Sequence, residues 1–191
     1  MKPNAAFAFF LLGPALCLLV PVPALYVLAP IPVRADDAMT ASADNFYTLA
    51  VKAGLSSGGG IPDAAARARY APLFTPRLNK ALADAATAQA RFMAKNKDSP
   101  PLIEGDIFSS LFEGPTAWKV GACTGDAKIA RCSVSLTRPD KGQPSVSWTD
   151  TLVLSNQGGW KVDDLAYDAN FAFGNTGTLN EMLKMAESEA K

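Results

Sequence analysis

Residues 116–167 read TAWKVGACTGDAKIARCSVSLTRPDKGQPSVSWTDTLVLSNQGGWKVDDLAY, and the rest of the chain is best understood from them. Four runs within them, 117–123, 131–137, 145–154 and 159–165, alternate apolar with polar residues, as half-buried β-strands do. Turn residues such as Thr-Gly-Asp and Asn-Gln-Gly-Gly separate the runs, and short joints favour antiparallel neighbours. The pattern predicts an antiparallel meander of four strands with one covered face.

The N-terminal segment has the pattern of a secretory signal peptide. Lys2 precedes an uncharged run over residues 5–20, and Val33-Arg34-Ala35 places small residues where signal peptidase reads them. We expect residues 1–35 to be removed, which leaves a single domain over residues 36–191. The alternatives are cleavage after Ala24 and an uncleaved membrane anchor, which prolines in this segment disfavour because each costs about 3 kcal/mol inside a helix. A periplasmic or secreted location follows.

Composition narrows the function classes. The chain holds 18 Lys and Arg against 18 Asp and Glu, with no basic stripe, so nucleic acid is not an expected partner. It holds no histidine, which removes the commonest general base and the commonest metal ligand. A Ser–His or Cys–His nucleophile cannot be built without it. We therefore expect no cofactor and no metal, and the sequence leans away from an enzyme.

The expected mature chain keeps two cysteines, Cys123 and Cys132, and an even count in an exported protein indicates a disulfide. A zinc site is the rival interpretation, but two thiolates without histidine make a poor one. A regular register around this pair would turn Val120 away from the face that carries Val134. Either a β-bulge near Gly121 corrects the register, or both faces of the sheet are partly buried.

Helices are predicted over residues 40–54, 62–70, 75–95 and 178–188. Ser42 is expected to cap the first, Pro62 to occupy the first position of the second, and Thr75 to cap the third. Thr-Leu-Asn-Glu at 178–181 is a capping box for the fourth. Residues 102–108 are apolar but contain glycine and two acids, which indicates an ordered loop or a short strand.

The order of these elements resembles the nuclear transport factor 2-like superfamily of cystatin-like α+β folds. More narrowly, it is similar to bacterial envelope proteins of domain-of-unknown-function family 3828, over roughly residues 44–186. The resemblance rests on Phe46-Tyr47, on residues 73–78 and 103–108, on Gly-Gly-Trp-Lys-Val-Asp-Asp at 158–164, and on Leu179 and Leu183 of the last helix. It implies a cone in which a curved sheet wraps a long helix around a cavity. It implies no activity.

Two carboxylates are candidate catalytic groups. Asp106 stands in an apolar setting, where a pocket acid would have the raised pKa that acid–base catalysis needs. The alternative for Asp106 is a structural carboxylate that accepts backbone N–H groups in a turn. Asp164 shares the parity of Trp160 on the last predicted strand, whereas Asp163 is expected to be solvated.

Aromatic residues are the ligand-binding candidates. Three lie on predicted strands and could line a cavity and stack on a ligand: Trp118, Trp148 and Trp160. The alternative is that they fill the core beneath a helix. Three more lie elsewhere in the chain, with the edge of the core as the alternative position: Tyr47, Tyr70 and Tyr167.

Three functions remain open. The first is a non-catalytic envelope module that binds a small apolar ligand or another protein. The second is a carboxylate-based hydrolase or isomerase that uses Asp106 and Asp164 in the cone cavity. The third is a protein-binding inhibitor or immunity partner. Membrane contact is expected only through an uncleaved N-terminal segment.

Overall fold

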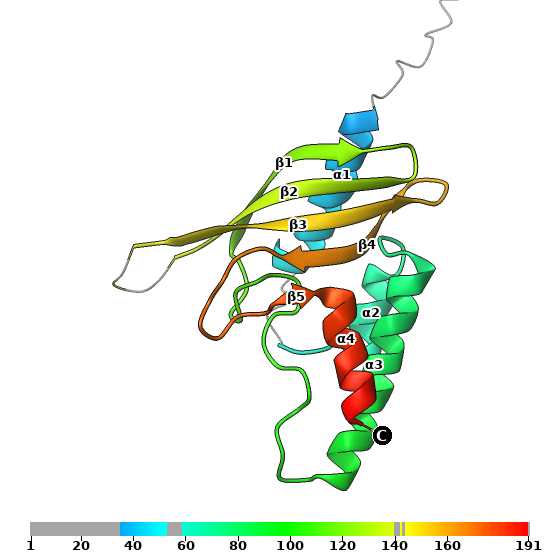
Figure 1. Ribbon diagram of the computed structural model, residues 1–191, viewed down its shortest axis with the longest axis vertical. Coiled ribbons are helices and arrows are strands. Elements are labelled where there is room, and N and C mark those ends of the chain that lie inside the picture. The colour runs from blue at the N-terminus through cyan, green and yellow to red at the C-terminus, as the bar shows by residue number, and fades with distance from the viewer. Residues whose placement is uncertain (1–34, 53–58, 140–141, 143, 191) are drawn as a thin grey trace, which may run out of the picture. The chain divides into compact units, whose positions relative to one another are not determined.

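Five antiparallel strands form one open sheet in the order β1-β2-β3-β4-β5 (Figure 1). Each predicted run corresponds, to within two residues at each end, to one of four long strands: β1 (Ala117–Gly125), β2 (Ile129–Arg138), β3 (Val146–Asn156) and β4 (Trp160–Tyr167). The sheet has five strands rather than four because β5 (Gly177–Thr178) pairs with the end of β4. Two residues are too few for period-two alternation, so the sequence carries no signal for β5.

The computed structural model describes residues 35–52, 59–139, 142 and 144–190. All described residues belong to one compact unit, Val33–Lys191. That unit is an α+β domain, as the sequence predicts. Its helices are α1 (Ala35–Tyr47), the π-helix η1 (Thr48–Lys52), α2 (Ala64–Tyr70), α3 (Pro76–Lys95) and α4 (Leu179–Glu189).

A β-bulge sets the register between β1 and β2. Val120 pairs with Val134 and Cys123 pairs with Cys132, so β1 carries one extra residue between them. The bulge returns Val120 and Cys123 to the covered face, because it inverts the alternation once. Cys123 and Cys132 form a disulfide whose Cα atoms lie 4.0 Å apart. The predicted disulfide and the bulge near Gly121 are both confirmed.

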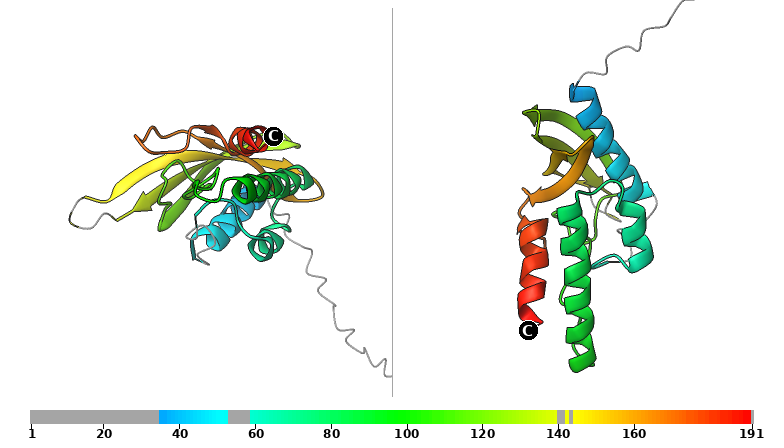
Figure 2. Two further views of the ribbon diagram at one scale, coloured as in Figure 1. Left: turned by 90° about the horizontal axis from the view of Figure 1, so that it is seen from below. Right: turned by 90° about the vertical axis from the view of Figure 1, so that its right-hand side faces the viewer.

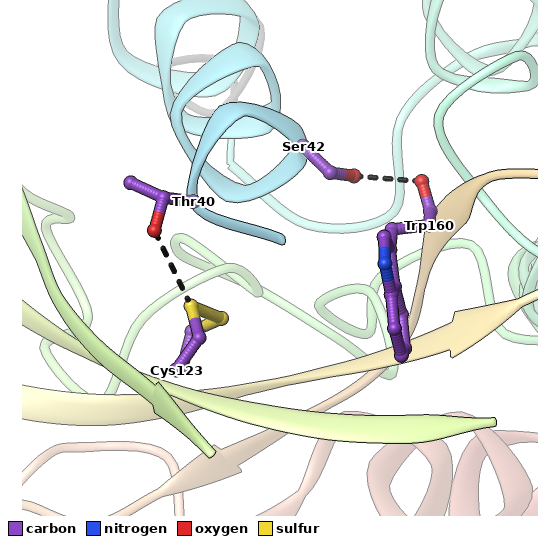
Figure 3. The surroundings of a disulfide bond; sticks show 5 residues. Thr40, Ser42, Cys123 and Trp160 are labelled. Atoms are coloured by element: carbon purple, nitrogen blue, oxygen red, sulfur yellow. Dashed lines mark hydrogen bonds between the residues drawn. A yellow bond between two sulfur atoms is a disulfide. The ribbon is translucent and has the colours of Figure 1, made fainter. Parts of the chain in front are cut away.

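Two predicted helix starts are wrong. α1 begins at Ala35 instead of near Thr40, with Asp36 and Asp37 in its first turn, where carboxylates favour the positive end of the helix dipole. Ser42 is therefore inside α1, and its hydroxyl donates to the carbonyl of Trp160 at 2.8 Å (Figure 3). The predicted end at Gly54 lies outside the described residues.

α2 begins two residues later than predicted. Pro62 precedes this helix instead of occupying its first position. Asp63 is the N-cap, and its carboxylate accepts the N–H of Ala66 at 2.7 Å.

The predicted N-terminal caps of the other two helices, α3 and α4, are correct. Thr75 caps α3, with its hydroxyl accepting the N–H of Leu78 and with Pro76 at the first position. Thr178 and Glu181 form the predicted capping box of α4. Residues 102–108 form an ordered loop with no regular secondary structure.

α1 lies across one face of the sheet, whereas the longest helix, α3, pairs with α4 and meets the sheet at β4 (Figure 2). The resemblance implies a sheet wrapped around the long helix, and α1 takes that place instead. The core between α1, α2, the residue 102–108 loop and the sheet is filled by large side chains that are 2% exposed or less. They include Phe46, Tyr47, Tyr70, Phe74, Phe108, Leu136, Leu152 and Leu165.

Candidate functional site

Asp106 holds a tight turn together. Its side chain is 4% exposed, and its Oδ1 accepts the N–H of Phe108 at 2.6 Å, while its own N–H donates to the carbonyl of Phe112 at 2.7 Å. Gly105 and Gly114 flank this turn with φ of 71°, a conformation that glycine adopts without strain. Asp106 therefore has the structural role that the sequence offered as an alternative to catalysis, a carboxylate that accepts a backbone N–H group in a turn.

Asp164 secures the start of α4. Its Oδ1 accepts the N–H groups of Leu165 at 2.9 Å and Asn180 at 3.0 Å. Asn180 is the second residue of α4, so the carboxylate also lies at the positive end of that helix. Asp164 therefore acts locally as an anchor between β4 and α4.

Asp163 is not the solvated residue that the sequence predicts. A register shift between Val153 and Leu154 leaves it as the extra residue of β4. Its carboxylate accepts the hydroxyl of Thr75 at 2.7 Å and pairs with the guanidinium of Arg77 at 2.6 Å. Burial opposes ionisation, but the hydrogen bonds from Arg77 and Thr75 outweigh it, so the pKa of Asp163 is lowered.

The two candidate catalytic acids line different clefts. Asp106 contributes to a cleft of about 460 Å³ whose other walls include Gln89, Ile103 and Phe112. Asp164 contributes to a groove of about 560 Å³ between α3 and α4. The pairing of these two acids in one cavity is thus not found, because the loop and β4 direct them to separate surfaces.

A third acid, Asp150 on β3, has no exposed surface and accepts four hydrogen bonds. The donors are Trp148 Nε1 at 3.1 Å, the N–H of Asp168 at 3.2 Å, and both the N–H, at 2.8 Å, and the hydroxyl of Ser110. Asp150 is not among the candidate residues predicted from the sequence. Its signal was available: Asp150 shares the parity of Trp148 and Leu152, which places a carboxylate on the covered face.

The tyrosine candidates lie in the core. The hydroxyls of Tyr47 and Tyr70 are buried and have no hydrogen-bond partner among the residues that the structure describes. Tyr167 donates its hydroxyl to the carbonyl of Ile107 at 2.8 Å. Burial, and then the charges of Asp150 and Asp106, raise the pKa of Tyr47. Burial raises the pKa of Tyr70 and of Tyr167 as well, and Asp106 adds to both shifts.

The tryptophan candidates do not meet. Trp148 is buried and faces Phe171 edge-on at 5.7 Å between ring centroids. Trp118 is half-buried on the edge strand, where its Nε1 donates to Asp44 at 2.9 Å and the ammonium of Lys52 lies 5.2 Å from its ring. Trp160 is half-buried on β4, beneath Ser42 of α1 (Figure 3). Each ring therefore serves a separate contact.

An open apolar groove lies where α1 passes into η1, against the turn between α2 and α3. Its volume is about 540 Å³, and its lining residues are Asn45, Thr48, Leu49, Lys52, Arg69, Pro72 and Leu73. We call it the η1 groove. Three of the seven come from the π-helix, a distortion that occurs often at functional sites. The sequence predicted an unbroken helix here, because no residue pattern distinguishes a π-turn from an α-turn.

No group of His, Cys, Asp or Glu side chains able to hold a metal ion occurs in the part of the chain that the structure describes. Within the same residues, no helix is both long and apolar enough to span a bilayer.

Comparison with known proteins finds no family model, no curated protein and no solved structure that matches this chain.

Proposed function

We propose that this protein is an exported, non-catalytic binding module of the bacterial cell envelope, and that it binds a small apolar ligand in the η1 groove. The observation that carries the proposal is the groove itself. Leu49, Pro72 and Leu73 give it apolar walls, and its volume of about 540 Å³ falls within the usual range for small-molecule sites. Leu49 belongs to η1 and Leu73 to the turn between α2 and α3, and both pack against the core, so the groove is formed before a ligand arrives.

The positions of the acids support binding over catalysis. Asp106, Asp150 and Asp164 each accept at least one backbone N–H, which is the work of carboxylates that fix loops and helix starts. A general base needs an oxygen within hydrogen-bond reach of a substrate proton. A hydrolase or isomerase built on Asp106 and Asp164 would also need the two acids in one cavity, and they line separate clefts.

The compartment and the family are part of the same proposal. The Cys123–Cys132 disulfide is typical of proteins that mature in an oxidising compartment, which supports export. Helices that precede an antiparallel sheet, with α1 across one face, support a cone-like member of the nuclear transport factor 2-like superfamily, related to domain-of-unknown-function family 3828.

Binding of a neutral apolar dye, N-phenyl-1-naphthylamine, tests the proposed function. The protein recovered from the cell envelope should enhance the fluorescence of the dye, and Leu49→Asn should reduce that enhancement several-fold by placing an amide in the groove wall. Met185→Asn is the matched control, because Met185 is 56% exposed on α4. Thermal melting of each variant separates lost binding from lost folding. Equal dye binding by wild type and a folded Leu49→Asn protein would refute the η1 groove as the site.

A second candidate function, binding to another protein, is favoured by one loop. Phe173 is 89% exposed in the loop between β4 and β5. That loop is held in place by Asn175, whose amide donates to the carbonyls of Asp106 at 2.6 Å and Ser109 at 2.8 Å. An exposed phenyl ring on an anchored loop is suited to fill a pocket on a partner protein. Loss of a partner from pull-downs with Phe173→Ser, but not with Met185→Asn, would support this role.

A further inference from the structure

We infer that the ligand of the η1 groove is an alkyl carboxylate, with its chain on the apolar wall and its carboxylate at Arg69. This inference rests on the proposed function and adds the chemical class of the ligand. It is carried by the charges around the groove, which are independent of its apolar lining.

The rim of the groove is cationic and has no acid of its own. Lys52 and Arg69 are both exposed and line it, and its five other residues are uncharged. Lys161 lies alongside, with its ammonium donating to the carbonyl of Pro72 at 2.9 Å. Asp44 of α1 directly precedes Asn45, the first lining residue of the groove in the sequence, and its carboxylate accepts the indole N–H of Trp118. The positive field over the groove is therefore not neutralised by its own lining.

Arg69 is the cation available to a ligand. It makes no hydrogen bond or ion pair with the residues that the structure describes, and its guanidinium offers the planar fork of donors that matches a carboxylate. Lys52 is directed differently, since its ammonium lies over the ring of Trp118. Arg67, two residues before Arg69, donates instead to the carbonyl of Pro62 at 2.6 Å. The free guanidinium thus stands beside the apolar wall.

The wall suits one flexible alkyl chain. Leu49 and Leu73 are half-buried and pack against the core, so their outer surfaces form a continuous support with Pro72. An open groove of this size covers one side of a chain, and partial burial of each methylene should strengthen binding about two- to fourfold. The combination of one chain and one free guanidinium selects an amphiphile with a single anionic head.

Titration calorimetry with decanoate, 1-decanol and hexanoate tests the inference on the protein recovered from the cell envelope. We expect decanoate to bind about tenfold more tightly than 1-decanol, since a charge-assisted contact is added, and hexanoate to bind at least tenfold more weakly than decanoate. Arg69→Gln should abolish the preference for decanoate over 1-decanol. Arg131→Gln, which removes an exposed charge from β2, should keep the preference.

The outcomes separate the two proposals. Equal affinity for decanoate and 1-decanol would overturn the carboxylate and leave apolar binding in place. An unchanged preference in Arg69→Gln would overturn the placement of the carboxylate at Arg69. Failure of both alkyl compounds and of N-phenyl-1-naphthylamine to bind would overturn both proposals. Binding to vesicles of phosphatidylglycerol without binding to decanoate would overturn the proposal of an alkyl carboxylate ligand and would indicate that the groove binds a lipid surface.

Discussion

Asp150 and Ser110 are joined twice: the carboxylate on β3 accepts both the N–H and the hydroxyl of a residue 40 positions earlier in the chain. The hydroxyl of Ser110 in turn accepts the N–H of Ala169 at 3.2 Å, and Asp150 accepts the N–H of Asp168. One buried side chain therefore ties the loop before β1 and the loop after β4 to the middle of the sheet.

Replacing Asp150 should be among the most damaging substitutions outside the hydrophobic core. Asp150→Asn replaces one carboxylate oxygen with an amide NH₂ group among four hydrogen-bond donors, so some of these buried donors lose their acceptor. We expect the free energy of unfolding to fall by about 2–4 kcal/mol. Urea unfolding measures the change. Asp84→Asn, which removes only the exposed pair with Lys80, should cost less than about 0.5 kcal/mol. A cost at Asp150 no larger than at Asp84 would contradict this account of the network.

The buried tyrosines should respond oppositely to loss of the hydroxyl. Tyr47→Phe and Tyr70→Phe remove hydroxyls that have no partner among the described residues, so the free energy of unfolding should stay unchanged or rise by up to about 1 kcal/mol. Tyr167→Phe removes the bond to Ile107 and should cost about 1 kcal/mol. Thermal melting compares the three. A clear loss in Tyr47→Phe would show that its hydroxyl is satisfied after all.

Alkaline pH should destabilise the fold through the same tyrosines. Burial raises the folded pKa of Tyr47, Tyr70 and Tyr167 above the ordinary 10.0. The unfolded chain then loses these protons first, so the stability is fully present below pH 10 and falls as the pH rises above it. Ultraviolet absorbance should show these tyrosinates appearing together with unfolding. Free titration of all tyrosines in the folded protein near pH 10 would rule this out.

Reduction of the disulfide should lower stability by about 2–3 kcal/mol, because the bridge closes a short loop in the unfolded chain. Its cysteines are nine residues apart, and Cys123 also contacts the hydroxyl of Thr40 on α1 at 3.8 Å. Urea unfolding of the Cys123→Ser/Cys132→Ser protein, or of wild type in reductant, measures the effect. Identical midpoints with and without reductant would argue against a stabilising bridge.

Acid below about pH 4 should remove the contribution of Asp163 to stability. Its folded pKa lies below the ordinary 3.8, so its pairing stabilises the protein above that pH and is lost as the pH falls through the folded pKa. Because Arg77 is largely exposed, Asp163→Asn should cost only about 1 kcal/mol at neutral pH, and the difference from wild type should shrink below pH 4. A difference that is constant from neutral pH to pH 3 would exclude the charge as its cause.

Features set by short-range chemistry could be predicted from the sequence. The Thr75 and Thr178 caps depend on residues within one helical turn, and the bulge near Gly121 is one of the two alternatives offered by the conflict between the cysteine pairing and the alternation of β1. The α+β class follows from the separation of the 3.6-residue and two-residue periods along the chain. In each case the interacting groups lie a few residues apart, so the pattern contains both partners.

Only the tertiary structure decided what the acids and the groove are. Asp150 meets its donors at Ser110 and Asp168 across 40 and 18 residues, and no local pattern encodes that meeting. The η1 groove likewise brings together Leu49 of the π-helix and Leu73 of the turn between α2 and α3, and sequence spacing does not reveal a π-turn. The resemblance placed the longest helix against the sheet, yet α1 lies there. Either α1 or α3 could cover the apolar face of the sheet, because both are amphipathic. Which of them does so depends on the packing of the whole core.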